Sequence, residues 1–134
     1  MLTNANITVF NKKNDSKTRS LIWNRTILHG VSAYINTRAV QQDNSGRIAN
    51  EAVFRVPESC TEYNQYLREH DYITSENTES FWTFATGDLI VEGECYLDIT
   101  GISTLLQNNI TPLRICAISD NRRGLNPHIR VRCE

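Results

Sequence analysis

The sequence predicts a mainly β fold, a small antiparallel β-barrel or sandwich of about seven strands with one or two short helices. Two observations lead to this prediction. Apolar and polar residues alternate with a period of two in most apolar segments, and clusters of Gly, Asn and Asp separate these segments at short intervals. A length of 134 residues suits one core, so we expect residues 1–134 to form a single barrel-like domain.

Short alternating segments account for the N-terminal half. The expected strands cover residues 7–9, 21–28, 31–35 and 48–56. Gly30 interrupts the pattern between the second and third strands. Pro57 ends the fourth, because proline cannot donate a ladder hydrogen bond and is tolerated best at the end or edge of a strand.

Residues 58–79 form a polar, acidic excursion from this pattern. Tyr63, Tyr66, Leu67 and His70 have helical spacing. We therefore expect either a short helix over residues 62–70 or an exposed loop.

The C-terminal half returns to alternation. The expected strands cover residues 81–85, 89–97, 113–119 and 129–133, with a tight turn at 86–88. A short helix is expected over residues 102–107. Asp98 or Thr100 can cap its start, and the Asn108-Asn109 pair can end it with a left-handed residue.

The near-neutral net charge of −1 conceals three blocks of opposite sign. Residues 1–57 carry a balance of +5, residues 58–98 (the acidic block) a balance of −9, and residues 111–134 a balance of +3. These charges either intermix and cancel in the fold or form a bipolar surface suited to docking between copies of the chain or with neighbouring proteins.

The sequence lacks the residue combinations that catalysis and metal binding require. His29, His70 and His128 lie far apart and match no metal or hydrolase spacing, and the cysteines have no zinc spacing. No secretory signal is visible, so we expect free, buried thiols. No apolar run is long enough for a transmembrane helix. We expect no enzyme, no cofactor, no metal and no membrane association.

Asp120-Asn121-Arg122-Arg123-Gly124 is the most distinctive local motif. Asp120 and Asn121 favour Asx turns, and Gly124 can supply a positive φ, so turn formation explains three of the five residues. The turn does not need its two arginines, which can pair with the acidic block within one chain or across a subunit boundary. The five residues are therefore either a turn alone or a turn and a subunit interface.

Phe81 and Trp82 are a second candidate for a subunit interface. Alternation within a strand directs one ring inward and the other outward, and an exposed aromatic can anchor an interface. Alternatively, the neighbouring acidic excursion covers both rings.

Several segments together resemble a known class of protein. They are Thr86-Gly87-Asp88-Leu89-Ile90-Val91-Glu92-Gly93, Asp98-Ile99-Thr100, Ile118-Ser119-Asp120-Asn121-Arg122-Arg123-Gly124, the strand His128-Ile129-Arg130-Val131-Arg132, and the opening Asn4 to Asn11 with its Ile-Thr-Val-Phe-Asn run. The pattern covers most of the chain and resembles small minor structural proteins of tailed bacteriophages, encoded among the head and neck genes of phages that infect Gram-positive bacteria.

The resemblance implies a head–tail connector role. Such a protein is a β-barrel subunit of a homo-oligomeric ring beneath the portal, which joins the capsid to the tail and helps retain packaged DNA. The implied partners are copies of itself, the portal or an adaptor protein, tail proteins, and double-stranded DNA that passes through the lumen. The implied location is the neck of the virion, after synthesis in the host bacterial cytoplasm. No catalytic residues or cofactors are implied.

Two alternatives remain. One is a tail terminator or tail-completion protein. The other is a small barrel that binds single-stranded nucleic acid through basic and aromatic side chains. Its candidate residues are Trp23, Tyr34, Phe81 and Trp82 for stacking and Arg25, Arg122, Arg130 and Arg132 for phosphate contacts.

Overall fold

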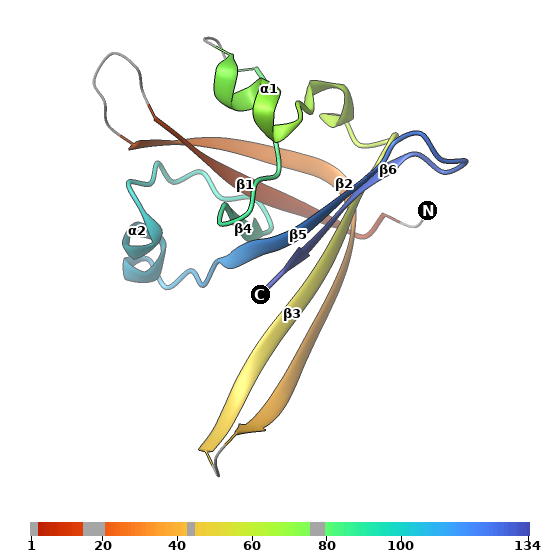
Figure 1. Ribbon diagram of the computed structural model, residues 1–134. Helices are drawn as coiled ribbons and strands as arrows, with labels where there is room; N and C mark the ends of the chain where they lie inside the picture. The colour runs from red at the N-terminus through yellow and green to blue at the C-terminus, as the bar shows by residue number, and fades with distance from the viewer. Residues whose placement is uncertain (1–2, 15–20, 43–44, 76–79) are drawn as a thin grey trace.

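The computed structural model describes residues 3–14, 21–42, 45–75 and 80–134, with the backbone alone for 36–42 and 45–50. The strands in this part of the chain are β1 (Ala5–Asn14), β2 (Leu21–Gln42), β3 (Ser45–Pro57), β4 (Leu89–Glu92), β5 (Leu113–Asn121) and β6 (His128–Cys133). The helices are the 3₁₀ turn η1 (Tyr63–Gln65), α1 (Glu69–Thr74) and α2 (Ile102–Gln107). The mainly β, antiparallel prediction is confirmed, with six described strands where about seven were expected (Figure 1).

The strands close into a ring in the order β1-β2-β3-β6-β5-β4, and every pairing is antiparallel. β2 connects two parts of this ring because its first half pairs with β1 and its second half with β3. The two strands expected at residues 21–28 and 31–35 are thus one strand.

Gly30 bends β2 without ending it. Its φ is 84°, a left-handed value that glycine adopts without a steric penalty. The pairing with β1 shifts register here, between Ala5 and Asn6, as in a β-bulge. The Asn6 side chain accepts a hydrogen bond from Gly30 N–H at 3.1 Å. The bulge lets one strand turn from its first partner to its second.

Beyond the ring, β2 and β3 continue as a two-stranded hairpin arm, defined here as residues 36–42 and 45–51. Its strands are joined by seven residue pairs, from Asn36 with Glu51 to Gln42 with Ser45. Among the described strands, none pairs with the outer edges of this arm. Figure 1 shows the arm extending away from the rest of the chain, on the side opposite α1.

The main core fills the ring, where the inward-facing residues of neighbouring strands are fully buried. It includes Ile7 and Val9 of β1, Leu28 of β2, Phe54 of β3 and Val131 of β6. A second apolar cluster packs Leu105 of α2 against Phe10, Leu89 and Val91. The cysteines are free, as expected; Cys60, Cys95 and Cys133 are buried, whereas Cys116 is half-buried.

The expected strand over residues 81–85 does not form. Trp82, Thr83, Phe84 and Ala85 are all buried, so the segment lacks a solvent face. Its backbone bonds to the acidic excursion instead, since Leu67 N–H donates to the Trp82 carbonyl at 2.8 Å and Trp82 N–H donates to the Gln65 carbonyl at 3.1 Å. The excursion itself contains η1 and α1 in place of one helix over 62–70, and its residues 76–79 lie outside the described part of the chain.

The expected tight turn at residues 86–88 is confirmed. Gly87 has a φ of 92°, and Asp88 N–H donates to the Ala85 carbonyl at 3.0 Å. β4 ends at Glu92, earlier than expected, because Gly93 has a φ of 79° and turns the chain.

Helix α2 covers the residues predicted for it. Asn109 adopts the predicted left-handed conformation beyond its end, with a φ of 61°. The predicted N-caps are wrong, because Gly101 occupies the N-cap position and makes no side-chain cap. Within the described residues, no helix is long and apolar enough to cross a membrane.

Candidate functional site

The turn between β5 and β6 presents the arginine motif. Arg122 N–H donates to Asp120 Oδ1 at 3.2 Å, which is the predicted Asx turn. Gly124 N–H donates to the Asn121 carbonyl at 3.3 Å. Gly124 does not have a positive φ, so the role expected of it in the turn is wrong.

Arg122 is held in one orientation by Asp120 and Tyr66. Its Nε donates to Asp120 Oδ1 at 2.8 Å and its Nη2 to Asp120 Oδ2 at 2.7 Å. The guanidinium carbon lies 4.8 Å from the centre of the Tyr66 ring, which is a cation–π contact. Hydrogen bonds from Arg122 hold the pKa of Asp120 below its usual value. The carboxylate therefore stays ionised and keeps the arginine in place.

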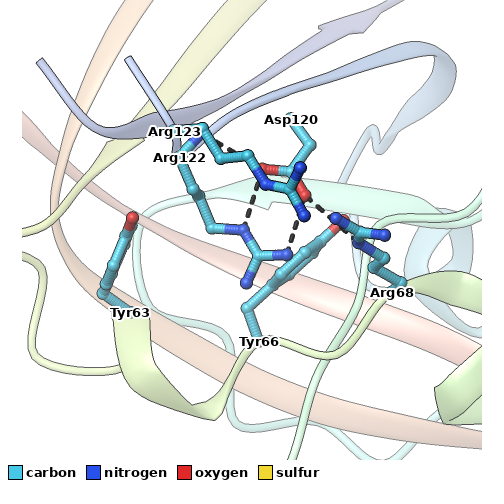
Figure 2. Close-up of a pocket in the computed structure, with 6 residues that line it drawn as sticks. All are labelled: Tyr63, Tyr66, Arg68, Asp120, Arg122 and Arg123. Carbon is cyan, nitrogen blue, oxygen red and sulfur yellow. Dashed lines mark hydrogen bonds and ion pairs between the residues drawn. The ribbon is translucent and has the colours of Figure 1, made fainter. Parts of the chain in front are cut away.

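Arg122 forms part of a surface pocket of about 670 Å³ (Figure 2). The arginine pocket is lined by Tyr63, Tyr66, Arg68, Asp120, Arg122 and Arg123. Three arginines against one aspartate give this lining a formal charge of +2. Arg68 Nε lies 3.6 Å from Asp120 Oδ2, so one carboxylate faces two guanidinium groups. Arg123 is exposed and forms no ion pair within the described residues.

An aromatic cluster positions Tyr66 beneath the turn. The Tyr66 and Trp82 ring centroids are 5.0 Å apart, as are those of Trp82 and Phe84. Trp82 Nε1 donates to the Glu62 carbonyl at 2.8 Å. The excursion is thus held by the side chain of Trp82 and by its backbone, and burial raises the pKa of the Tyr66 hydroxyl.

The structure separates the candidate interface residues into accessible and buried ones. Asp120, Asn121, Arg122, Arg123 and Gly124 share one turn at the surface. Asn121 Nδ2 lies 3.2 Å from His128 Nε2.

Of the aromatic pair, Phe81 is 37% exposed and Trp82 is completely buried. Only Phe81 can therefore face a partner, and the alternative with both rings covered is wrong. Trp82 instead supports the excursion that carries one wall of the pocket.

Sequence patterns do not place Tyr63, Tyr66 and Arg68 at this site. The helical spacing of the tyrosines was visible, but the pairing of their segment with the β5–β6 turn depends on Trp82. The cation–π contact joins residues that lie more than fifty positions apart. Arg68, the single arginine or lysine of the acidic block, lies 3.6 Å from Asp120 of the arginine turn, so the charges of this pair are the reverse of those expected.

A second polar cluster surrounds the side chain of Glu62, whose backbone carbonyl accepts the hydrogen bond from Trp82. Its carboxylate contacts the Nδ1 of His29, and Glu94 Oε1 lies 3.2 Å from His29 Nε2. The hydrogen bond that the His29 ring donates to the Glu62 carboxylate is the main cause that raises the pKa of His29. No group of three or more His, Cys, Asp or Glu side chains in the described ranges could hold a metal ion.

The pocket has the chemistry of an anion receptor. Guanidinium groups match the geometry of carboxylates and phosphates. The contact with the Tyr66 ring also keeps the hydrogen-bond donors of Arg122 in a fixed orientation. The fold and the pocket together define a small, mainly β protein with a closed ring of strands, a projecting arm and an arginine-lined pocket.

The chain belongs to a family of unknown function, DUF6751, whose model matches residues 2–134. No curated protein and no solved structure matches it significantly.

Proposed function

We propose that this protein is a structural subunit of the neck of a tailed bacteriophage, where copies of it form a ring that joins the portal and capsid to the tail and helps retain packaged DNA. The resemblance of most of the chain to small phage neck proteins suggests this role. The structural observation that carries the proposal furthest is the hairpin arm.

The arm favours assembly because no other described strand of the chain pairs with it. An isolated two-stranded hairpin is at best marginally stable in water, and its open edges can pair with other strands. Seven residue pairs at about 3.3 Å per residue give the arm a reach of roughly 20 Å. A neighbouring subunit would cover the arm and extend its hydrogen bonding.

The charge distribution supports head-to-tail contacts. A closed ring needs two different, complementary faces on each subunit. The arginine pocket supplies a positive face, since its Arg123 has no ion pair among the described residues. Among the described residues, three exposed acids also form no ion pair: Glu58, Glu69 and Glu92. We propose that an acid of one copy reaches Arg123 of the next.

Native mass spectrometry and negative-stain microscopy of the purified full-length chain test the assembly. We expect closed rings of a single copy number. A variant in which residues 37–50 are replaced by Asn-Gly should remain folded by circular dichroism, because every ring pairing lies outside this segment, but should no longer form rings. Rings that persist in this variant, or a full-length chain that stays monomeric both alone and with purified phage heads, would contradict the proposal.

The charge contact has its own test. Arg123→Glu should dissociate the ring, whereas Lys12→Glu, the same reversal at an exposed residue of β1, should not. Phage particles that lack the protein should accumulate as packaged heads that leak DNA and fail to join tails, and the purified chain should restore joining. Assembled tails without a terminated end, together with heads that retain their DNA, would instead identify a tail terminator.

A further inference from the structure

A second basic surface lies on the outside of the ring, away from the arginine pocket. It is formed by Tyr34 of β2, Arg55 of β3, and Arg130 and Arg132 of β6, which we call the outer basic face. Strand alternation directs these side chains outward, because the residues between them, Phe54 and Val131, are completely buried in the core.

The register of the sheet brings these residues together. Arg55 lies directly opposite Arg130, and Arg132 lies opposite Val53. Val53 in turn lies opposite Tyr34 on the other side of β3. The face therefore has two adjacent rows, one with two arginines and one that runs from Tyr34 across Val53 to Arg132.

This arrangement is electrostatically unfavourable in the isolated chain. Directly opposed residues on neighbouring strands have Cβ atoms about 5 Å apart, and like charges at that distance destabilise a sheet. Within the described part of the chain, neither Arg55 nor Arg130 forms an ion pair. Arg132 lies 3.7 Å from Glu134, and both side chains are largely exposed, so the pair contributes little. An anionic partner would relieve this repulsion.

Tyr34 indicates which anion. Its side chain is 63% exposed and lies opposite the half-buried Val53, so an aromatic ring is presented on the same sheet surface as three arginines. Proteins that bind single-stranded nucleic acid without sequence preference combine these two features: aromatic rings stack on unpaired bases, while basic side chains follow the phosphates. Arg130 and Arg132, two residues apart on one strand, are about 7 Å apart along the backbone direction, so they can contact different phosphates.

We propose that the outer basic face binds single-stranded nucleic acid without sequence preference, with a base stacked on Tyr34 and phosphates held by Arg55, Arg130 and Arg132. Unpaired bases are required because the faces of paired bases are stacked on one another inside a duplex. The proposal does not depend on the proposed neck function, since its residues lie outside the arginine pocket and the arm.

Fluorescence anisotropy with a labelled oligothymidylate of about 20 nucleotides tests the proposal. Three phosphate contacts predict that log K falls with log salt with a slope of about −2. Tyr34→Ala should weaken binding roughly five- to 150-fold, the range of a lost base–aromatic stack. Arg130→Gln should weaken binding and reduce the slope by about 0.7. Lys12→Gln removes the same charge from β1 and should leave both the affinity and the slope unchanged.

Three results would overturn the proposal. One is the absence of binding at about 50 mM salt, where phosphate contacts are strong. Another is equal affinity for a duplex of the same length with no effect of Tyr34→Ala, which would indicate a plain polyanion contact. The third is an Arg130→Gln variant that changes the mass of the assembly while the wild-type chain binds no oligonucleotide, which would identify the face as a protein interface.

Discussion

Asp88 is a buried carboxyl whose protonation should affect the stability of the whole chain. It is completely buried beside Asn11, whose Nδ2 donates to Asp88 Oδ2 at 2.9 Å. Burial raises the pKa of Asp88 to about 6, although the hydrogen bond from Asn11 acts in the opposite direction. Between about pH 4 and pH 6 the folded chain therefore binds more protons than the unfolded chain. This carboxyl stabilises the fold at acid pH, and its contribution is lost as the pH rises through 6.

Asp88→Asn should remove this pH dependence, because the amide keeps an oxygen for Asn11 and cannot ionise. We expect the free energy of unfolding of the variant, relative to that of the wild type, to rise by about 2 kcal/mol from pH 4.5 to pH 7.5. Urea denaturation at both pH values measures the difference. A difference that does not change with pH would mean that Asp88 is not responsible.

The pKa of His29 should lie above the ordinary value for a histidine. Glu62 and Glu94 both contact its ring, and both raise its pKa. A raised pKa means that the protonated form stabilises the fold below the unfolded-state pKa and that this contribution is lost as the pH rises through the folded-state value. In NMR titrations Glu62→Gln should lower the pKa of His29, whereas Glu58→Gln, which changes an acid four residues before Glu62 with no described contact to His29, should leave it unchanged.

At the scale of the elements, the continuity of β2 depends on one glycine. No atom lies within 4 Å of the position that a Gly30 side chain would occupy, so its φ of +84° alone opposes substitution. Gly30→Ala should reduce the free energy of unfolding by about 1–2 kcal/mol, the cost of a left-handed alanine. Gly101→Ala is the matched control, since Gly101 has equally open surroundings and an extended φ of 169°. Equal losses in urea denaturation would contradict the role of φ at Gly30.

The elements that sequence patterns predicted well are those stabilised locally. The alternation of β1, β3 and β6 and the left-handed Asn109 after α2 depend on neighbouring residues, and all were visible in the sequence. The segment around Trp82 was assigned to a strand because its composition suits one. Its backbone forms hydrogen bonds with Gln65 and Leu67 instead of with a neighbouring strand. These are long-range contacts, which a local sequence pattern does not predict.

The residues of the candidate site also divide into those that local sequence patterns predict and those that reach the site through long-range contacts. Asp120 was predictable because an Asx turn is local chemistry, and Arg122 stood out because the turn does not need it; in the structure three hydrogen bonds join the two residues. Tyr66 and Arg68 were missed at the pocket because they reach it only through the aromatic cluster. The useful signal in the sequence was the pair of arginines that the turn does not need, because both line the pocket at the surface.

At the scale of the whole molecule, the ring closes through its shortest pairing. β4 and β5 share two residue pairs, whereas β1 and β2 share ten. We call this contact between β4 and β5 the seam. Two further backbone hydrogen bonds lie beside it: Gly87 N–H donates to the Ile115 carbonyl at 3.0 Å, and Ile115 N–H donates to the Asp88 carbonyl at 2.9 Å. Because stability is not uniform across a fold, the seam is where the ring should open first.

Hydrogen exchange should therefore detect opening at the seam before the ring unfolds. In the wild type, the Ile115 amide should exchange faster than the amides of β6, which pairs with a strand on each side. Asp88→Ala should accelerate exchange selectively at Ile115, because it leaves Asn11 Nδ2 and Lys12 N–H without their carboxylate acceptor beside the seam. Asp98→Ala removes a completely exposed carboxylate and should leave the seam unchanged. Uniform acceleration across β6 and Ile115 in the Asp88→Ala variant would instead mean that the ring opens only by global unfolding, with no weak seam.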